Sequence, residues 1–387
     1  MRYLANPPAY GHPDDGEERP PFVLIEPYAY FVARDNATTA TCEMRGSDGN
    51  FKITFCTARP PLVSYMCFEA TAYDHTAFGV EPQILATETD GGLVLLRIVF
   101  GDKPSAIFYP DNIEYLVYVA SVPSLKHLPH PGSLQYSDDS IAFVRKCAHG
   151  AGSHDCSNCG YVIVAHSGGF EYPQPFQLYL YDSDSGAWGI KQLVVLEPNP
   201  SLDPDRVPYH STCKAITVGG TTVAWVDLWH NIVICDDVLA ERPTLRTLEL
   251  PPPMSYNEVR GGNPRSLRDI ALLDGLFKYV QIQPGSPIPM GFFEWEVTVW
   301  STKTSSSSAK DWVAEYKLKS TEIPEMSLPE LRVDVGRPQP TLSTLHIGLP
   351  IPCLQDAGIV YLLSKVYHCD NDHVAWVLAV DMRNKTI

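Results

Sequence analysis

From residue 22 onward the chain is divided into short apolar stretches, several of which alternate apolar and polar residues. These stretches are rich in Val, Ile, Tyr, Phe, Trp and Thr, and Gly, Pro, Asn, Asp or Ser residues bound them. That pattern is typical of half-buried β-strands. Examples are residues 22–33, 92–100, 176–182, 277–283 and 373–382. No long stretch carries the 3.6-residue apolar period of a helix, so the sequence predicts an all-β fold.

A loosely repeated hairpin narrows the expected architecture. Residues 176–195 begin with a strand of alternating apolar and polar residues. An Asp/Ser/Gly turn follows, and Trp188 begins a second strand. Residues 293–319 repeat this design with Trp300 and Trp312 around a Ser-rich loop. Four-stranded blades with aromatic packing produce such a pattern. We therefore predict an irregular β-propeller-like ring of about five or six blades, with a β-sandwich or paired β domains as the alternative.

The domain organisation follows from where the apolar stretches begin. Residues 1–21 are polar and rich in Pro, Gly and acidic residues, which predicts a flexible lead-in. Residues 22–387 are expected to form a single propeller-like domain.

Composition and charge indicate which classes of partner and which cell compartment to expect. The net charge is −16, from 45 acidic and 29 basic residues, which disfavours nucleic acid and anionic membranes as partners. The chain lacks an apolar signal-peptide core and an apolar run of roughly 18 residues, so we expect a cytoplasmic or nuclear protein. In those compartments the 10 cysteines are expected to be reduced thiols.

One stretch concentrates metal-binding residue types. Residues 146–160 read KCAHGAGSHDCSNCG, and Cys147, His154, Cys156 and Cys159 are candidate zinc ligands. The Cys-x2-Cys spacing lets two thiolates reach one ion. Against zinc, the two halves of such a site usually come from separated segments, and here they are nearly contiguous. The favoured interpretation of this stretch is therefore an exposed hairpin loop with reduced thiols. A third interpretation, besides this loop and a zinc site, is a redox-sensitive Cys156–Cys159 pair. No other cofactor is expected.

Two further polar positions are interpreted as structural. Asp227 lies between Trp225 and Trp229, where its carboxylate is expected to accept a hydrogen bond from a turn. Arg268 and Asp269 begin a predicted strand and are expected to form an inter-blade ion pair that fixes register.

Several blocks together resemble the plant family called domain of unknown function 1618, which is expanded in grasses. They appear in family order and span most of the chain; the most specific is ITVGGTTVAWVDLWHNIVICDDVLAERPTLRTLELPPP (216–253), and the others are NATTA (36–40), SYMCFEA (64–70), RSLRDIALLDGLFKYVQI (265–282) and AWVLAVDMRNKT (375–386). The resemblance implies an intracellular plant protein and no particular activity. The region 146–160 departs from the family pattern, in which this turn is often short and charged.

The expected function is that of a non-enzymatic protein-interaction scaffold, because no catalytic motif is found and binding residues concentrate on loops of a rigid frame. The candidate surface comprises loops 146–160, 254–264 and 301–310. One alternative is a zinc-stabilised recognition module that uses residues 147–159. The other is a propeller-type hydrolase or lyase, which requires His and carboxylate groups to converge.

Overall fold

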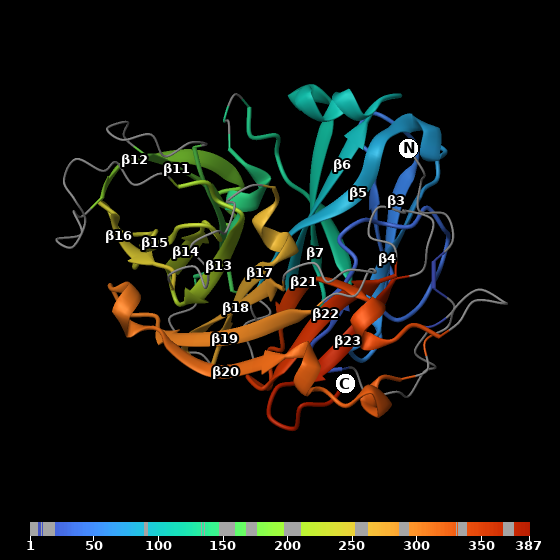
Figure 1. Cartoon of the computed structure of the whole chain (residues 1–387). Helices are drawn as coiled ribbons and strands as arrows, with labels where there is room; N and C mark the ends of the chain where they lie inside the picture. Colours follow the sequence, from blue (N-terminus) through green and yellow to red (C-terminus); the bar gives the residue numbers. More distant parts are fainter. Residues whose placement is uncertain are drawn as a thin grey trace. The chain divides into compact units, whose positions relative to one another are not determined.

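The chain is described by a computed structural model (Figure 1). It describes residues 7, 8, 10, 20–88, 92–132, 134, 136–146, 159–167, 176–196, 210–251, 262–285, 294–329, 331, 339–366 and 375–387. Within these residues the chain is all-β, as the sequence predicts. The helices found there are 3-10 turns of three to five residues, namely η1 (His75–Ala77), η2 (Pro104–Phe108), η3 (Pro110–Asn112), η4 (Asp138–Ser140), η5 (Pro264–Ser266), η6 (Ala309–Asp311), η7 (Ser320–Glu322), η8 (Glu325–Ser327) and η9 (Leu342–Thr344).

Within the described residues, the strands form five sheets, whose neighbouring strands are mostly consecutive in the chain. The first sheet has the order β1-β4-β3-β2 and contains β1 (Leu24–Ile25), β2 (Ala40–Glu43), β3 (Asn50–Cys56) and β4 (Val63–Ala70), with β1 parallel to β4. The second is an antiparallel meander of β5 (Phe78–Thr87), β6 (Leu93–Phe100), β7 (Ile113–Val119) and β8 (Ser124–His127).

The third sheet has eight strands in the order β13-β14-β15-β16-β12-β11-β10-β9. Its strands are β9 (Ala142–Arg145), β10 (Tyr161–His166), β11 (Phe176–Asp182), β12 (Ala187–Leu196), β13 (Lys214–Gly219), β14 (Thr222–Val226), β15 (Asn231–Cys235) and β16 (Thr244–Glu249). A short parallel contact joins its two four-stranded halves, with Val195 opposite Thr244 and Leu196 opposite Leu245.

The last two sheets are antiparallel meanders. One consists of β17 (Arg268–Leu273), β18 (Leu276–Pro284), β19 (Trp295–Lys303) and β20 (Val313–Lys319), and the other of β21 (His346–Pro352), β22 (Ile359–Lys365) and β23 (Trp376–Asp381). The Trp-bearing hairpins predicted around residues 176–195 and 293–319 are confirmed as β11–β12 and β19–β20.

The chain divides into two compact units. Unit 1 comprises Met1–Leu196, Lys214–Trp225 and Ile234–Leu245, and unit 2 comprises Glu197–Cys213, Val226–Val233 and Arg246–Ile387.

Strand β6 shows how the pattern of apolar residues builds unit 1. Successive side chains of a strand point to opposite faces. Leu96 and Ile98 belong to a buried cluster with the first sheet, whereas Leu93 and Leu95 belong to one with β9 and β10. Because both faces of β6 are covered, apolar residues occupy both faces of the strand, and Arg97 is its one polar residue. In unit 2, side chains of β18 and β19 share a buried cluster with those of β22 and β23. This face-to-face packing of sheets also fits the β-sandwich alternative.

Candidate functional site

The Cys/His loop, residues 146–160, contains the candidate zinc ligands. Cys147, His154 and Cys156 lie outside the described residues, and Cys159 lies inside them, partly buried. The two ends of the loop meet, because the Lys146 N–H donates to the Gly160 carbonyl at 2.9 Å. The Arg145 guanidinium also donates to the Cys159 carbonyl at 3.3 Å. Strands β9 and β10 therefore hold both stems of the loop.

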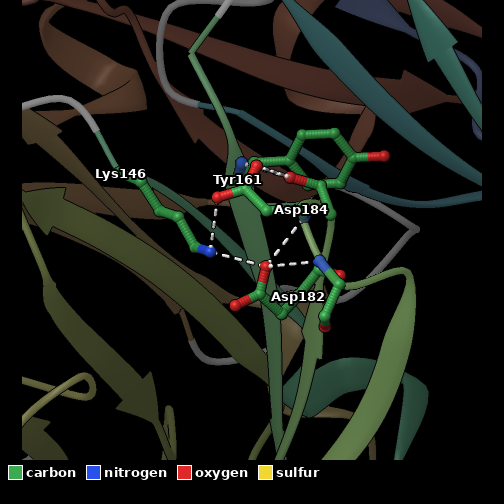
Figure 2. A network of polar contacts seen from close by, with 6 residues as sticks. Lys146, Tyr161, Asp182 and Asp184 are labelled. Atoms are coloured by element: carbon green, nitrogen blue, oxygen red, sulfur yellow. Dashed lines mark hydrogen bonds and ion pairs between the residues drawn. The ribbon is translucent and has the colours of Figure 1, made fainter.

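A polar network fixes the base of this loop to the β11–β12 turn (Figure 2). The Lys146 Nζ donates to Asp182 Oδ1 at 2.5 Å and to Asp184 Oδ2 at 2.9 Å. Asp182 Oδ1 also accepts the Asp184 N–H at 2.8 Å. The hydrogen bond from Lys146 lowers the pKa of Asp182, and the bond to Asp182 raises the pKa of Lys146. Both groups are therefore charged at neutral pH, and Lys146 and Asp182 form an ion pair at the base of the loop.

Tyr161 and Gly160 also contact the β11–β12 turn. The Tyr161 N–H donates to the Ser183 hydroxyl at 2.8 Å, which joins β10 to the turn. A Cβ added at Gly160 would lie 2.4 Å from Asp184 Oδ1, so only glycine fits there without displacing the carboxylate. Among the residues that the structure describes, no group of three or more His, Cys, Asp or Glu is placed to hold a metal ion. Zinc binding by residues 147–159 stays a prediction.

The Ser-rich loop 301–310 is held by one arginine of unit 2. The Arg246 guanidinium donates to the Thr304 carbonyl at 2.6 Å and to the Ser306 carbonyl at 3.0 Å. The Thr302 hydroxyl contacts the Ser306 hydroxyl at 2.9 Å. Of the third predicted loop, 254–264, the structure describes only residues 262–264.

The β6–β7 loop, residues 101–112, is a surface feature that the sequence pattern does not predict. Phe108 is 81% exposed and Tyr109 is 62% exposed, at the junction of η2 and η3. Both turns begin with a proline, Pro104 and Pro110. Figure 1 shows the two turns as cyan coils joining β6 to β7. The signal in the sequence was an aromatic pair directly before a proline in a polar loop.

The aromatic tip, as we call Phe108 and Tyr109, stands on a fixed backbone. The Tyr109 N–H donates to the Ala106 carbonyl at 3.0 Å, and its own carbonyl accepts the Asn112 N–H at 3.0 Å. Ala106 is buried, and a Cβ added at Gly101 would lie 2.5 Å from its Cβ. The tip is thus presented to solvent by a loop that packs against its own sheet.

Asp227 organises the β14–β15 turn, as the sequence predicts. Its Oδ1 accepts the Trp229 N–H at 2.8 Å, and its Oδ2 accepts the Ser211 N–H at 2.8 Å and His230 Nδ1–H at 2.9 Å. Arg268 also contacts this turn: its guanidinium lies 4.3 Å from the Trp229 ring centroid and donates to the Leu228 carbonyl at 3.1 Å. The predicted Arg268–Asp269 ion pair stays a prediction.

A thiol, an imidazole and a carboxylate meet where β2 approaches β8. His127 Nε2 donates to the Glu43 carbonyl at 2.7 Å and lies 3.8 Å from Cys42 Sγ. Its Nδ1 lies 3.2 Å from Glu114 Oε2, as an ion pair without hydrogen-bond geometry. The Cys42 thiol and then the Glu114 carboxylate raise the pKa of His127 to about 10. A ring protonated on both nitrogens has no lone pair to accept a proton from Cys42, so this arrangement supports structure rather than base catalysis.

We expect the His127 cation to make stability depend on alkaline pH. The pKa is raised above the ordinary value in the folded protein, so the stabilisation is fully present below about pH 6.5. It is lost as the pH rises through the folded pKa of about 10. The wild type should have a higher free energy of unfolding than His127→Gln at pH 6. This difference should be about 1–2 kcal/mol smaller at pH 10, as measured by urea unfolding at both pH values. A constant difference between the two proteins at both values would contradict this assignment.

Part of the chain matches a known family. The family described as "Protein of unknown function (DUF1618)" matches residues 225–361, from Trp225 in β14 to Tyr361 in β22. Over these residues, which are less than half of the chain, the match supports the family resemblance drawn from the sequence. A search of curated proteins found no match. Within the described residues, no helix has the length and apolar character needed to cross a bilayer.

Proposed function

We propose that the protein is a non-enzymatic scaffold that binds a partner protein through its surface loops. The aromatic tip is the observation that carries this proposal, because Phe108 and Tyr109 expose two adjacent rings on a fixed backbone. Exposed aromatic side chains are the residues that most often dominate binding energy once a partner buries them. A loop that is already ordered loses little conformational entropy on binding.

The chemistry around the tip indicates the kind of surface that it fits. Two aromatic rings require an apolar pocket on the partner, and Asp102, Lys103 and Asp111 flank them with both signs of charge. The net charge of −16 favours a partner whose rim is neutral or basic over an acidic one. The proposed compartment is the cytoplasm or the nucleus.

For the architecture, we propose that the sheets are blades of a propeller-like ring. Supporting this, each sheet is built from strands that are consecutive in the chain. If the eight-stranded sheet is divided at its short parallel contact, the described strands form six candidate blades: β1–β4, β5–β8, β9–β12, β13–β16, β17–β20 and β21–β23. Consecutive antiparallel meanders of four strands are the usual form of a propeller blade. Such a ring would present the connecting loops on rigid edges, as a scaffold requires.

Alanine substitution of the tip tests the scaffold. We expect the double variant Phe108→Ala, Tyr109→Ala to retain less than about a tenth of the partner that the wild type captures from extracts of its own organism. Its urea midpoint should be nearly unchanged, because exposed side chains contribute little to folding.

Val122→Ala is the matched control. Val122 is 71% exposed in the β7–β8 turn, at the other end of β7 from the tip. Capture should be unaffected by this change. Equal capture by the tip variant and by Val122→Ala would remove the tip from the binding surface.

A further inference from the structure

Part of the predicted lead-in is seated on the first sheet. The Tyr65 hydroxyl lies 2.8 Å from the Tyr10 carbonyl and 3.2 Å from the Pro8 carbonyl, and both are acceptors. The Tyr10 ring packs edge-on against the Tyr65 ring, with centroids 6.5 Å apart. Two backbone carbonyls and one side chain of the segment therefore contact a single buried tyrosine of β4.

The receiving surface is built around that tyrosine. The Arg34 guanidinium donates to the Tyr65 hydroxyl and lies 5.5 Å from its ring centroid, and Tyr30 packs on the same ring at 5.5 Å. Because Arg34 donates to a lone pair of the Tyr65 hydroxyl, the proton of this hydroxyl is directed to the Pro8 and Tyr10 carbonyls. Burial raises the pKa of Tyr65, which keeps this proton in place. The surface is thus an aromatic site with a donor aimed at the Pro8 and Tyr10 carbonyls.

The seated segment carries a recognition pattern of its own. Residues 7–10 read Pro-Pro-Ala-Tyr. Proline-rich segments adopt polyproline II conformation, and aromatic grooves of WW type bind them through exposed carbonyls and ring contacts. WW-type grooves that select Pro-Pro-x-Tyr read the tyrosine as well. The groups that such a groove would need are the Tyr10 ring and the two carbonyls that contact Tyr65.

We propose that Pro7, Pro8 and Tyr10 form a docking motif for a partner domain with a WW-type aromatic groove, and that Tyr65, held by Arg34, occupies the Pro8 and Tyr10 carbonyls and one side of the Tyr10 ring while no partner is bound. The same carbonyls and ring cannot serve both surfaces at once. Partner binding therefore requires the segment to leave Tyr65. The affinity of the full chain then equals the affinity of the free segment multiplied by the fraction of molecules in which the segment has left. This inference goes beyond the aromatic tip and does not depend on it.

The test compares binding to a purified WW domain that selects Pro-Pro-x-Tyr ligands, by fluorescence anisotropy or calorimetry. A synthetic peptide of residues 1–16 should bind several-fold more tightly than the full chain. Tyr65→Phe in the full chain should raise its affinity about 3- to 10-fold, the range that loss of one hydrogen bond allows. Tyr10→Ala should abolish binding.

Controls separate shielding from unfolding and from the proposed scaffold. Arg34→Gln leaves Tyr65 in place and should raise the affinity in the same direction, which keeps the test valid if Tyr65→Phe folds poorly. Tyr73→Phe, at a half-exposed tyrosine of the same unit, should change nothing. The Phe108/Tyr109 double alanine variant should bind the WW domain like the wild type. A peptide that does not bind, or a full chain that binds as tightly as the peptide, would overturn the proposal.

Discussion

Replacing Trp225 with phenylalanine is expected to lower the free energy of unfolding by about 2–4 kcal/mol. Trp225 is 1% exposed, and its indole N–H donates to the Ser140 carbonyl at 2.8 Å. Its ring packs edge-on against His166, with centroids 5.4 Å apart. Phenylalanine fills less of this space and leaves a buried carbonyl without its donor, so the cavity and the lost hydrogen bond both destabilise the fold.

Urea unfolding at neutral pH measures this effect. The midpoint should fall with an unchanged slope, which indicates a change in stability rather than in the compactness of the end states. Ile190→Ala, at a half-exposed position of β12 in the same unit, is the control and should cost less than about 1 kcal/mol. Similar losses for Trp225→Phe and Ile190→Ala would contradict the role assigned to Trp225.

Asp227→Ala is expected to cost about 3 kcal/mol, because it removes a buried acceptor from three donors at once. The Ser211 and Trp229 N–H groups and the His230 ring all lose their carboxylate partner. Asp227→Asn should destabilise almost as much, since its amide group would turn a donor toward donors.

The control for this series is another aspartate with the same local contact. Asp237 is exposed, and its Oδ1 accepts the Leu239 N–H at 2.9 Å, two residues along the chain. Asp237→Ala should cost about 0.5–1 kcal/mol by urea unfolding, as exposed contacts of this kind do. If Asp227→Ala cost no more than Asp237→Ala, the turn would not depend on the buried carboxylate.

Much of the strand content could be predicted from the sequence, because alternation and turn residues are local signals. The hairpins around Trp188 and Trp300 were predictable in this way, and the Asp227 turn followed from its place between two apolar strands. The parallel contact of β12 with β16 was not predictable, since it pairs residues about 50 positions apart that carry no pairing signal of their own.

The candidate surface was harder to predict than the fold. In the sequence, Phe108 and Tyr109 cannot be told apart from aromatic residues that are buried. Their exposure depends on how the loop packs, with Ala106 buried and close to Gly101. The stacking of Arg268 on Trp229 likewise depends on a contact between distant segments. The Cys/His loop dominates the sequence chemically, yet the structure describes only its stems.

The scaffold account is tested most directly by a photoreactive residue at the tip. Tyr109 would be replaced by benzoyl-phenylalanine in the full chain, with the same residue at Val122 as the control, and both proteins irradiated in cell extract. The account predicts a crosslinked species of defined mass from position 109 and none of that mass from position 122. The same species from both positions, or a co-purifying partner that never crosslinks at position 109, would contradict it.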